Sequence, residues 1–170
     1  MEIKFCRRCG ATVTKKNETE FVCSNGHRLF YASLPAIGVF IVNDQNEVLL
    51  VTRGAEPGVG KLDTPGGFCD AGESIEQTIA RELREELTID PEQYGDLDFI
   101  CSAVNDYEFG GEMTHPLDLF FVARVPGRIV VRPADDAAAA DWYDIALVDP
   151  EDMAFKTARQ AFAQLKTRLG

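Results

Sequence analysis

Three acidic residues, Glu82, Glu85 and Glu86, stand close together in the stretch ARELREEL. In an α-helix, at about 100° per residue, their side chains fall within an arc of about 100° on one face. Carboxylates gathered in this way repel one another unless cations neutralise them, and Mg²⁺ or Mn²⁺ prefer oxygen ligands. The sequence therefore predicts a magnesium or manganese site on one face of a helix.

The helix that carries these acids is predicted to begin after Ser74, because Gln77 stands at capping-box spacing from it. Its buried side is marked by four apolar residues at helical spacing, Ile75, Ile79, Leu83 and Leu87. Arg81 lies at the edge of the acidic face, where its guanidinium can bind or orient a carboxylate or a phosphate. The alternative is a solvated, charge-rich surface helix. The acids cluster instead of alternating with bases, and a Gly-Gly turn with Glu73 precedes them, which disfavours that alternative.

Written from Gly67, this stretch resembles the signature of the Nudix hydrolases, G-x5-E-x7-R-E-U-x-E-E-x-G-U. One position differs, because Thr88 stands where the family usually has a glycine that ends the helix. The resemblance implies an α/β/α sandwich around a mixed sheet. It also implies hydrolysis of a nucleoside diphosphate linked to another group.

The same resemblance implies a role for each residue of the signature. The metal-binding acids are Glu82, Glu85 and Glu86. A backbone carbonyl of Gly66 or Gly67 adds a ligand, while Glu73 and Arg81 orient the helix acids. Metal ions neutralise the oxygens of a pyrophosphate, stabilise the leaving phosphate and lower the pKa of the attacking water.

The N-terminal segment contains CRRCG and CSNGH, which together resemble a zinc ribbon. Three thiolates and one imidazole, from Cys6, Cys9, Cys23 and His27, suit tetrahedral zinc. A second C-x-x-C would place a cysteine at Gly26, so His27 comes one residue late. The alternative is that His27 is an ordinary surface residue and the cysteines are buried. The segment is too short and polar for its own apolar core, which favours structural zinc.

These two segments predict a zinc ribbon over residues 1–33 and a Nudix domain over residues 34–170. Such a pairing resembles the NADH pyrophosphatases and a related group that hydrolyses ADP-ribose or FAD. The S-Q-P-W-P-F-P-x-S stretch usual in the NADH type is missing. The later stretches DDAAAADWYD and DPEDMAFKTARQA resemble a segment of ADP-ribose and FAD hydrolases. A nucleotide sugar or a dinucleotide diphosphate is therefore favoured over a nucleoside triphosphate.

An additional acid outside the signature is expected to act as base or metal ligand, because Ala139 stands where relatives often carry one. Glu112 is preferred, since it lies in a glycine-containing loop of the kind that closes over a site. The alternatives are Glu108, Asp135 and Asp136.

Aromatic side chains are the usual means of stacking on a nucleobase or flavin. Tyr107 and Phe109 share the loop of Glu112 and are the candidates for substrate binding. Three other aromatic residues are expected to serve mainly in packing, namely Phe40, Phe68 and Trp142, and His115 is interpreted as structural. The remaining cysteines, Cys69 and Cys101, are also interpreted as packing residues.

Other elements must position these groups. Residues 36–44 and 47–53 predict a β-hairpin that leads into a long Gly- and Pro-rich loop ending at Gly66 and Gly67. The C-terminal stretch AFKTARQAFAQLKTRLG predicts a helix packed on the sheet.

Composition sets the outer limits of function. The chain has 170 residues, of which 45% are apolar. Its net charge of -11 disfavours a surface that binds along a nucleic-acid backbone. It shows no signal peptide and no apolar run long enough to span a membrane, so a cytoplasmic location is expected. An odd count of five cysteines argues against a disulfide framework.

The expected partner is a small-molecule nucleotide, and a homodimer is an option from the family alone. Two other functions remain open. One is a nucleotide-sensing regulator whose zinc ribbon binds a partner, although sensors of this type tend to lose the acids that this sequence keeps. The other is hydrolysis of the 5′ end of NAD-capped RNA.

Overall fold

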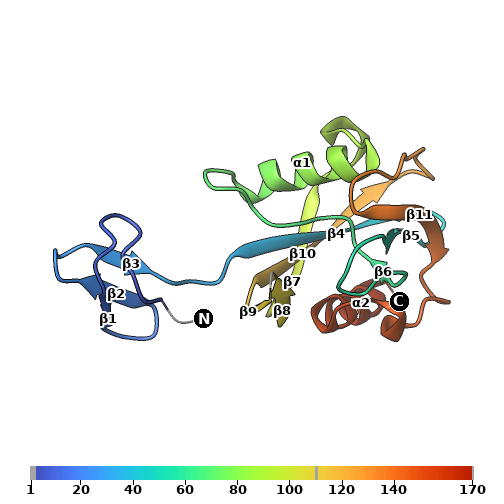
Figure 1. The fold of residues 1–170 in the computed structure, drawn as a ribbon. Helices are drawn as coiled ribbons and strands as arrows, with labels where there is room; N and C mark the ends of the chain where they lie inside the picture. The colour runs from blue at the N-terminus through green and yellow to red at the C-terminus, as the bar shows by residue number, and fades with distance from the viewer. Residues whose placement is uncertain (1–2, 110, 170) are drawn as a thin grey trace.

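The computed structural model describes residues 3–109 and 111–169 and contains a small N-terminal sheet followed by a larger α/β unit (Figure 1). The small sheet is antiparallel, and its strands are β1 (Val13–Lys15), β2 (Glu20–Cys23) and β3 (Arg28–Phe30). It is drawn in blue at one side of the molecule, and an extended segment joins it to the larger unit. The buried residues of the cluster that packs on this sheet are Cys6, Cys23 and Leu29, so the apolar contribution to its stability is small.

The larger unit is built on a mixed sheet. Its strands are β4 (Pro35–Asn43), β5 (Glu47–Arg53), β6 (Leu62–Asp63), β7 (Leu97–Val104), β10 (Leu117–Val125) and β11 (Ala137–Asp144). The order is β11-β5-β4-β10-β7, with β6 paired to β5. The pairing of β4 with β10 is parallel and the other pairings are antiparallel, so the mixed sheet predicted from the sequence is confirmed. The predicted hairpin corresponds to β4 and β5.

Two helices cover opposite faces of this sheet, α1 (Ile75–Leu87) on one and α2 (Lys156–Leu169) on the other (Figure 1). Alternate residues of β4 face the two helices, as the period of two in a strand requires. Val39 and Ile41 pack in the cluster that contains Leu83 of α1, whereas Phe40 packs in the cluster that contains Phe162 of α2. The α/β/α sandwich is therefore confirmed, and Phe40 is a core residue.

Helix α1 begins and ends as its sequence indicates. The N–H of Gln77 donates to Ser74 Oγ over 3.3 Å, and the N–H of Ser74 donates to Gln77 Oε1 over 2.8 Å, which completes the capping box. At the other end Thr88 adopts φ 59°, the left-handed conformation that usually favours glycine, and its N–H donates to Arg84 O over 3.0 Å. The departure at Thr88 thus leaves the helix end intact.

Smaller elements complete the chain. They are the hairpin of β8 (Tyr107–Phe109) and β9 (Glu112–Thr114), and the 3-10 turns η1 (Pro91–Gln93) and η2 (Pro150–Asp152). The cysteines Cys69 and Cys101 are half-buried against the two cores, as expected of packing residues. Among the described residues, no helix is both long enough and apolar enough to cross a bilayer.

Candidate active site and metal centre

The glycine turn approaches α1 so closely that side chains are excluded from it. A Cβ on Gly67 would lie 2.5 Å from Glu82 Oε1, and a Cβ on Gly66, whose φ is +144°, would lie 2.2 Å from Ile37 O. The N–H of Gly66 donates to Glu86 Oε2 over 2.9 Å. The turn therefore lies directly against two of the three helix acids.

Arg81 connects these acids to the loop before the helix. Its Nε and Nη2 donate to the two oxygens of Glu73 over 2.9 and 3.0 Å. Its Nη1 donates to Glu82 over 2.8 Å and to Glu85 over 3.2 Å, and its Nη2 also donates to Phe68 O over 3.0 Å. One guanidinium thus fixes the loop, the turn and the acidic face relative to one another.

The electrostatics of the helix acids follow from their surroundings. Burial raises the pKa of Glu86 to about 8, with the charge of Glu82 adding to the effect. Burial also raises the pKa of Glu82. In contrast, the hydrogen bonds from Arg81 lower the pKa of Glu73 to about 2. Two partly buried carboxyls that resist ionisation beside a third acid, Glu85, form a donor set that a hard divalent cation fits.

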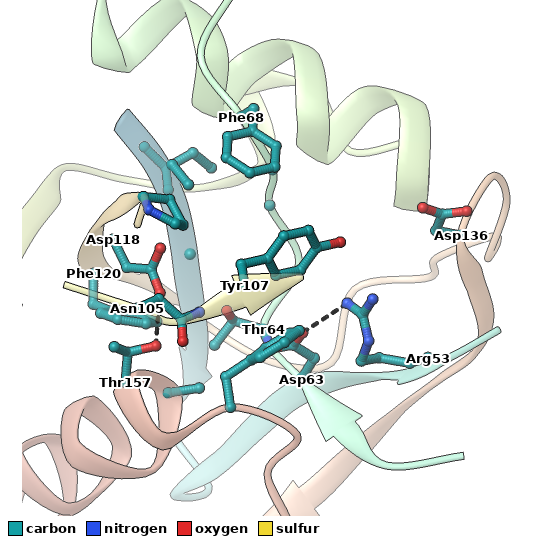
Figure 2. Close-up of a pocket in the computed structure, with 18 of the residues that line it drawn as sticks. Arg53, Asp63, Thr64, Phe68, Asn105, Tyr107, Asp118, Phe120, Asp136 and Thr157 are labelled. Carbon is teal, nitrogen blue, oxygen red and sulfur yellow. Dashed lines mark hydrogen bonds and ion pairs between the residues drawn. The ribbon is translucent and has the colours of Figure 1, made fainter. Parts of the chain in front are cut away.

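A pocket of about 170 Å³ opens beside these acids and is shown in Figure 2. Glu86, Gly66, Gly67 and Asp136 line one part of it. Its walls include three aromatic rings, those of Phe68, Tyr107 and Phe155. The centroid of the Tyr107 ring lies 5.8 Å from the centroid of each of the other two rings. The pocket therefore combines an acidic part with apolar walls, as small-molecule sites usually do.

Several polar residues of this pocket were not predicted from the sequence. Arg53 donates to Asp63 over 3.0 Å and lies 4.8 Å from the centre of the Phe155 ring. Burial raises the pKa of Asp63 to about 6. The other unpredicted lining residues include Asn105, Asp118 and Thr157. One signal was present for Asp118, because it lies two residues before Phe120 in β10 and so shares the inward face of that strand with Phe120 and Val122.

Among the predicted aromatic residues, Tyr107 and Phe68 do line the pocket. The side chain of Phe109 lies outside the part of the chain that the structure describes. Trp142 packs against the core on the α1 side, and its Nε1 donates to Ile129 O over 3.4 Å. His115 is exposed and its Nδ1 lies 3.0 Å from Asp106 Oδ1, outside the main pocket.

The predicted additional acids are placed differently from one another. Glu112 and Glu108 are exposed on the β8–β9 hairpin and are not among the residues that line the main pocket. Asp136 lines that pocket. The charge of Asp135 contributes to the raised pKa values of Glu82 and Glu86, which places it near the helix acids.

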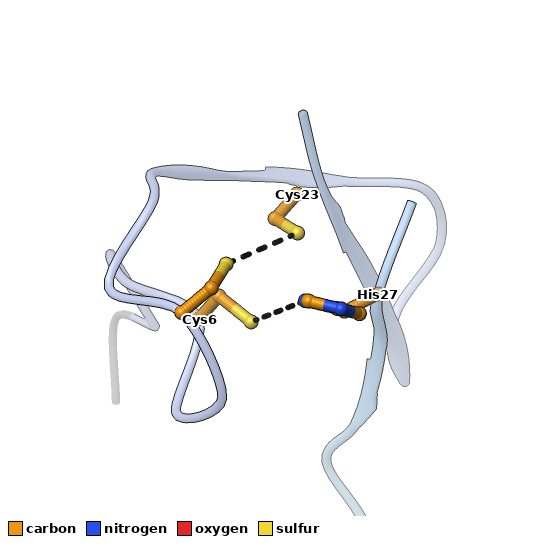
Figure 3. A group of neighbouring side chains, drawn as sticks. Cys6, Cys23 and His27 are labelled. Carbon is orange, nitrogen blue, oxygen red and sulfur yellow. Dashed lines mark hydrogen bonds between the residues drawn. The ribbon is translucent and has the colours of Figure 1, made fainter. Parts of the chain in front are cut away.

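The four predicted zinc ligands come together in the N-terminal sheet, with ligand atoms all within 4.8 Å of one another (Figure 3). Cys9 Sγ lies 3.8 Å from Cys23 Sγ, and Cys6 Sγ lies 3.6 Å from His27 Nδ1. A tetrahedral zinc with bonds of about 2.3 Å to sulfur and about 2.0–2.1 Å to nitrogen requires an S···S separation of about 3.8 Å and an S···N separation of about 3.5–3.6 Å. The spacing of the ligand atoms therefore fits zinc, and His27 is near the cysteines despite its late position in the sequence.

Two of these thiols have shifted pKa values. The backbone N–H of Ala11 and the side chain of Asn25 lower the pKa of the Cys9 thiol to about 6. Burial raises the pKa of Cys23. Donors directed at a sulfur favour its thiolate form, which is the form that binds metal.

The geometry agrees with a comparison against protein families. Residues 32–165 match the model of the NUDIX domain. The chain belongs to the Nudix family. This match covers the α/β unit up to the last turn of α2, including the glycine turn, α1 and the pocket.

Three similar proteins are hydrolases of three different substrates. An ADP-ribose pyrophosphatase of Methanocaldococcus jannaschii is 30% identical over 112 residues, which is 65% of this chain and 63% of that protein. The NAD-capped RNA hydrolase NudC of Stutzerimonas stutzeri is 29% identical over 164 residues, which is 95% of this chain and 53% of that protein. The human mitochondrial NAD(P)H pyrophosphatase NUDT13 is 35% identical over 91 residues, or 52% of this chain and 25% of that protein. The chain thus spans less than two thirds of these relatives.

Solved Nudix structures resemble the fold. The Nudix domain of Shewanella oneidensis NrtR complexed with ADP ribose aligns with a TM-score of 0.63 and 26% identity, covering 83% of this chain and 91% of that one. A Nudix hydrolase from Nitrosomonas europaea aligns with a TM-score of 0.66 and 23% identity, covering 98% of this chain and 93% of that one.

Proposed function

We propose that this Nudix protein hydrolyses the pyrophosphate bond of a nucleoside diphosphate linked to another group, with Mg²⁺ or Mn²⁺ as cofactor. The substrates favoured are ADP-ribose and a dinucleotide such as NADH or FAD. The observation that carries the proposal is the close approach of the Gly66–Gly67 turn to Glu82 and Glu86 beside a pocket with aromatic walls. Similarity to pyrophosphatases of ADP-ribose and NAD(P)H supports the same substrate class.

The metal would be held by Glu82, Glu85 and Glu86 together with a carbonyl of Gly66 or Gly67. When bound, it would neutralise the pyrophosphate oxygens and lower the pKa of the attacking water. The chain itself fixes the acids in place. Arg81 holds Glu82 and Glu85 while it is anchored by Glu73.

An acid outside the signature would act as base or additional ligand. Glu112 was preferred from the sequence, but it is exposed on the β8–β9 hairpin and is not among the residues that line the main pocket. Asp135 and Asp136 are better placed, and we favour them for this role. A Glu112→Gln variant with full turnover, beside an Asp135→Asn or Asp136→Asn variant with reduced turnover, would support this choice.

We further propose that zinc, held by Cys6, Cys9, Cys23 and His27, stabilises a separate N-terminal module over residues 1–33, with the Nudix domain over residues 34–170. The separations of the ligand atoms and the small apolar core of this module support a structural zinc. A cytoplasmic location and a homodimer stay predictions from the sequence.

Hydrolysis of NAD-capped RNA is a second candidate. The similarity to NudC covers 95% of the chain and so includes the N-terminal module. That module is basic although the chain as a whole is acidic, because residues 1–33 contain six Lys or Arg and three Glu. A basic module would favour an RNA backbone through counterion release.

Product analysis would test both candidates. The purified protein is incubated with Mg²⁺ and, separately, ADP-ribose, FAD, NADH, a diadenosine polyphosphate, nucleoside triphosphates and a short NAD-capped RNA. We expect AMP from ADP-ribose or a dinucleotide, and loss of this product in the Glu85→Gln variant. Turnover of the capped RNA at a much higher kcat/KM than NADH would favour the second candidate. Absence of all turnover would reject the proposal and favour the sensing alternative.

A further inference from the structure

One part of the pocket holds three buried polar residues that the proposed chemistry does not use. They are Asn105 after β7, Asp118 in β10 and Thr157 in the first turn of α2, and they are 8%, 9% and 3% exposed. All three line the pocket. In Figure 2 they lie on the opposite side of the pocket from Asp136, with Tyr107 between. We refer to these three residues as the polar trio.

Asp118 is the acceptor at the centre of the polar trio. Thr157 Oγ1 donates to Asp118 Oδ2 over 2.6 Å, and the side chain of Asn105 also hydrogen-bonds to this carboxyl. Burial raises its pKa, and these two hydrogen bonds oppose the shift, with no cation contributing among the described residues. A carboxylate offers about four acceptor positions, so two internal donors leave capacity for a further donor, and Asp118 lines the pocket.

An acid in this position is costly unless it gains a partner. Burial of a charged or polar group in apolar surroundings is unfavourable without compensating hydrogen bonds. Phe120, two residues along β10, and Ala158, next to Thr157, are apolar lining residues of the same pocket. A ligand that donates a hydrogen bond would add to the compensation that Thr157 and Asn105 already give Asp118.

The pocket dimensions define what such a ligand can be. Its volume of about 170 Å³ is below the roughly 300–1,000 Å³ of pockets that enclose a whole drug-sized ligand. It therefore suits one ring system of a larger substrate. The rings of Phe68, Tyr107 and Phe155 supply faces and edges on which a planar heteroaromatic ring can stack.

We propose that the polar trio, through Asp118, recognises an amino group on a planar heteroaromatic ring of the substrate. The inference rests on the proposed function. It places the aromatic ring of the substrate at the polar trio, while the pyrophosphate of the same substrate would lie near Glu86 and Asp136. Both the adenine of ADP-ribose and the carboxamide-bearing ring of NAD carry an NH₂ group of this kind. Replacement of that group by an oxygen acceptor would leave Asp118 facing a repulsive partner.

Matched substrate pairs test this inference without any mutation. ADP-ribose is compared with inosine diphosphate ribose, and NAD is compared with nicotinic acid adenine dinucleotide. Affinities are measured by calorimetry on the Glu85→Gln variant with Mg²⁺, and kcat/KM is measured on the unmodified protein. We expect the amino form to be preferred about tenfold or more in one of the two pairs, since a charged hydrogen bond is replaced by repulsion. The pair that responds identifies the ring.

Variants then assign the preference to the polar trio. Asp118→Asn keeps the shape, but the donors from Thr157 and Asn105 would hold the amide oxygen and turn the amide NH₂ toward the ligand. We expect the preference to disappear or to reverse toward the oxygen form. The matched control is Asp98→Asn, an exposed carboxyl on β7 of the same sheet, which should keep the preference. If Asp118→Asn does not fold, Thr157→Val should weaken the preference and Thr157→Ser should retain it.

The outcomes separate this inference from the proposed function. Equal affinity and turnover for both members of each pair would overturn the inference while leaving a hydrolase intact. An unchanged preference of Asp118→Asn for the amino form would also overturn the inference, because a group other than Asp118 would then bind the amino group. A binding preference without turnover by the unmodified protein would support the inference and reject hydrolysis.

Discussion

Arg81 and Glu73 form a two-pronged ion pair, with Nε to Oε1 at 2.9 Å and Nη2 to Oε2 at 3.0 Å. Glu73 also accepts from Thr78 Oγ1 over 2.9 Å and from the N–H of Asp70 over 3.2 Å, so its carboxylate is anchored from both sides. The remaining nitrogen of Arg81, Nη1, points to Glu82 and Glu85. The pair therefore orients Glu82 and Glu85, two of the acids proposed to hold the metal, through the contacts of Arg81.

Replacement of Arg81 by lysine should lower activity through this positioning. A lysine keeps the charge but cannot make the planar set of contacts to Glu73, Glu82 and Phe68 O. We expect kcat to fall about 10–100-fold, the range typical of residues that orient metal ligands, with a higher Mg²⁺ requirement. Steady-state assays over a Mg²⁺ titration would measure both. Arg84→Lys, an exposed residue of the same helix that pairs with Asp90, should behave like the unmodified protein.

Replacement of Gly67 by alanine should displace Glu82. The new Cβ would lie 2.5 Å from Glu82 Oε1, so either the turn or the carboxylate must move. A misplacement of about 1 Å costs on the order of 100-fold in rate. We expect a loss of activity of that order with a small change in Tm. Gly127→Ala is the matched control, because a Cβ there meets no atom within 4 Å; if both variants lost activity equally, steric displacement of Glu82 would not be the cause.

The acidic face, the capping box and the cluster of three cysteines with His27 could be predicted from the sequence because each depends on short motifs whose residues are near one another along the chain. Helical spacing alone places Glu82, Glu85 and Glu86 together. The polar trio could not be predicted in this way, since Asn105, Asp118 and Thr157 come from three elements that meet only through sheet pairing and the packing of α2.

Glu112 illustrates that the sequence alone does not tell which acid outside the signature lies at the pocket. Its glycine-containing loop predicts a flap over the site, and this role stays a prediction, because residue spacing does not specify toward which side a hairpin points. The structure instead places Asp136, a residue from the loop before β11, at the pocket.

Stability without Mg²⁺ should depend on pH through Glu86. Its pKa is about 8 in the native state and near 4.5 in the unfolded chain. Between these values the native state keeps a proton that the unfolded state has released, so the free energy of unfolding falls as pH rises from about 4.5 to about 8. We expect Glu86→Gln, dialysed free of Mg²⁺, to be more stable than the unmodified protein at pH 8 by roughly 1–3 kcal/mol. Urea unfolding at pH 5 and pH 8 would measure the difference.

Mg²⁺ supplies the control for that experiment. Added Mg²⁺ should stabilise the unmodified protein at pH 8, because metal binding favours the ionised acids of the native state. The same addition should have little effect on Glu86→Gln. Mg²⁺ is removed by dialysis, because a strong chelator would also remove zinc. An equal pH dependence of the free energy of unfolding in both proteins would contradict the assignment to Glu86.

Zinc removal should affect the N-terminal module first. We expect one zinc per chain by elemental analysis, and a loss of this zinc in the Cys23→Ala variant, since three ligands hold the ion more weakly than four. Proteolysis of that variant should begin within residues 3–33 before the α/β unit is cut. Cys101→Ala, outside the cluster, should keep its zinc, and zinc retention in Cys23→Ala would reject the proposed ligand set.

The edge strand β7 is stabilised by the last turn of α2. Arg168 Nη1 donates to Phe99 O over 2.8 Å, and its Nη2 donates to Ile100 O over 2.7 Å, at the irregularity in the pairing of β7 with β10. These carbonyls belong to the outer edge of the sheet, where unpaired backbone groups invite pairing with another chain. Replacement of Arg168 by methionine keeps much of the aliphatic stem but removes both donors. We expect a destabilisation of about 1–3 kcal/mol and greater aggregation on heating.

Urea unfolding and light scattering during a temperature ramp would measure these two effects of Arg168→Met. Arg124→Met provides the comparison, because Arg124 is an exposed arginine of the neighbouring strand β10. Both variants lose one positive charge, so a change confined to Arg168→Met isolates the carbonyl contacts from the change in net charge. Equal behaviour of the two variants would show that the contacts of Arg168 to β7 contribute little, and that protection of this edge comes from the bulk of α2 alone.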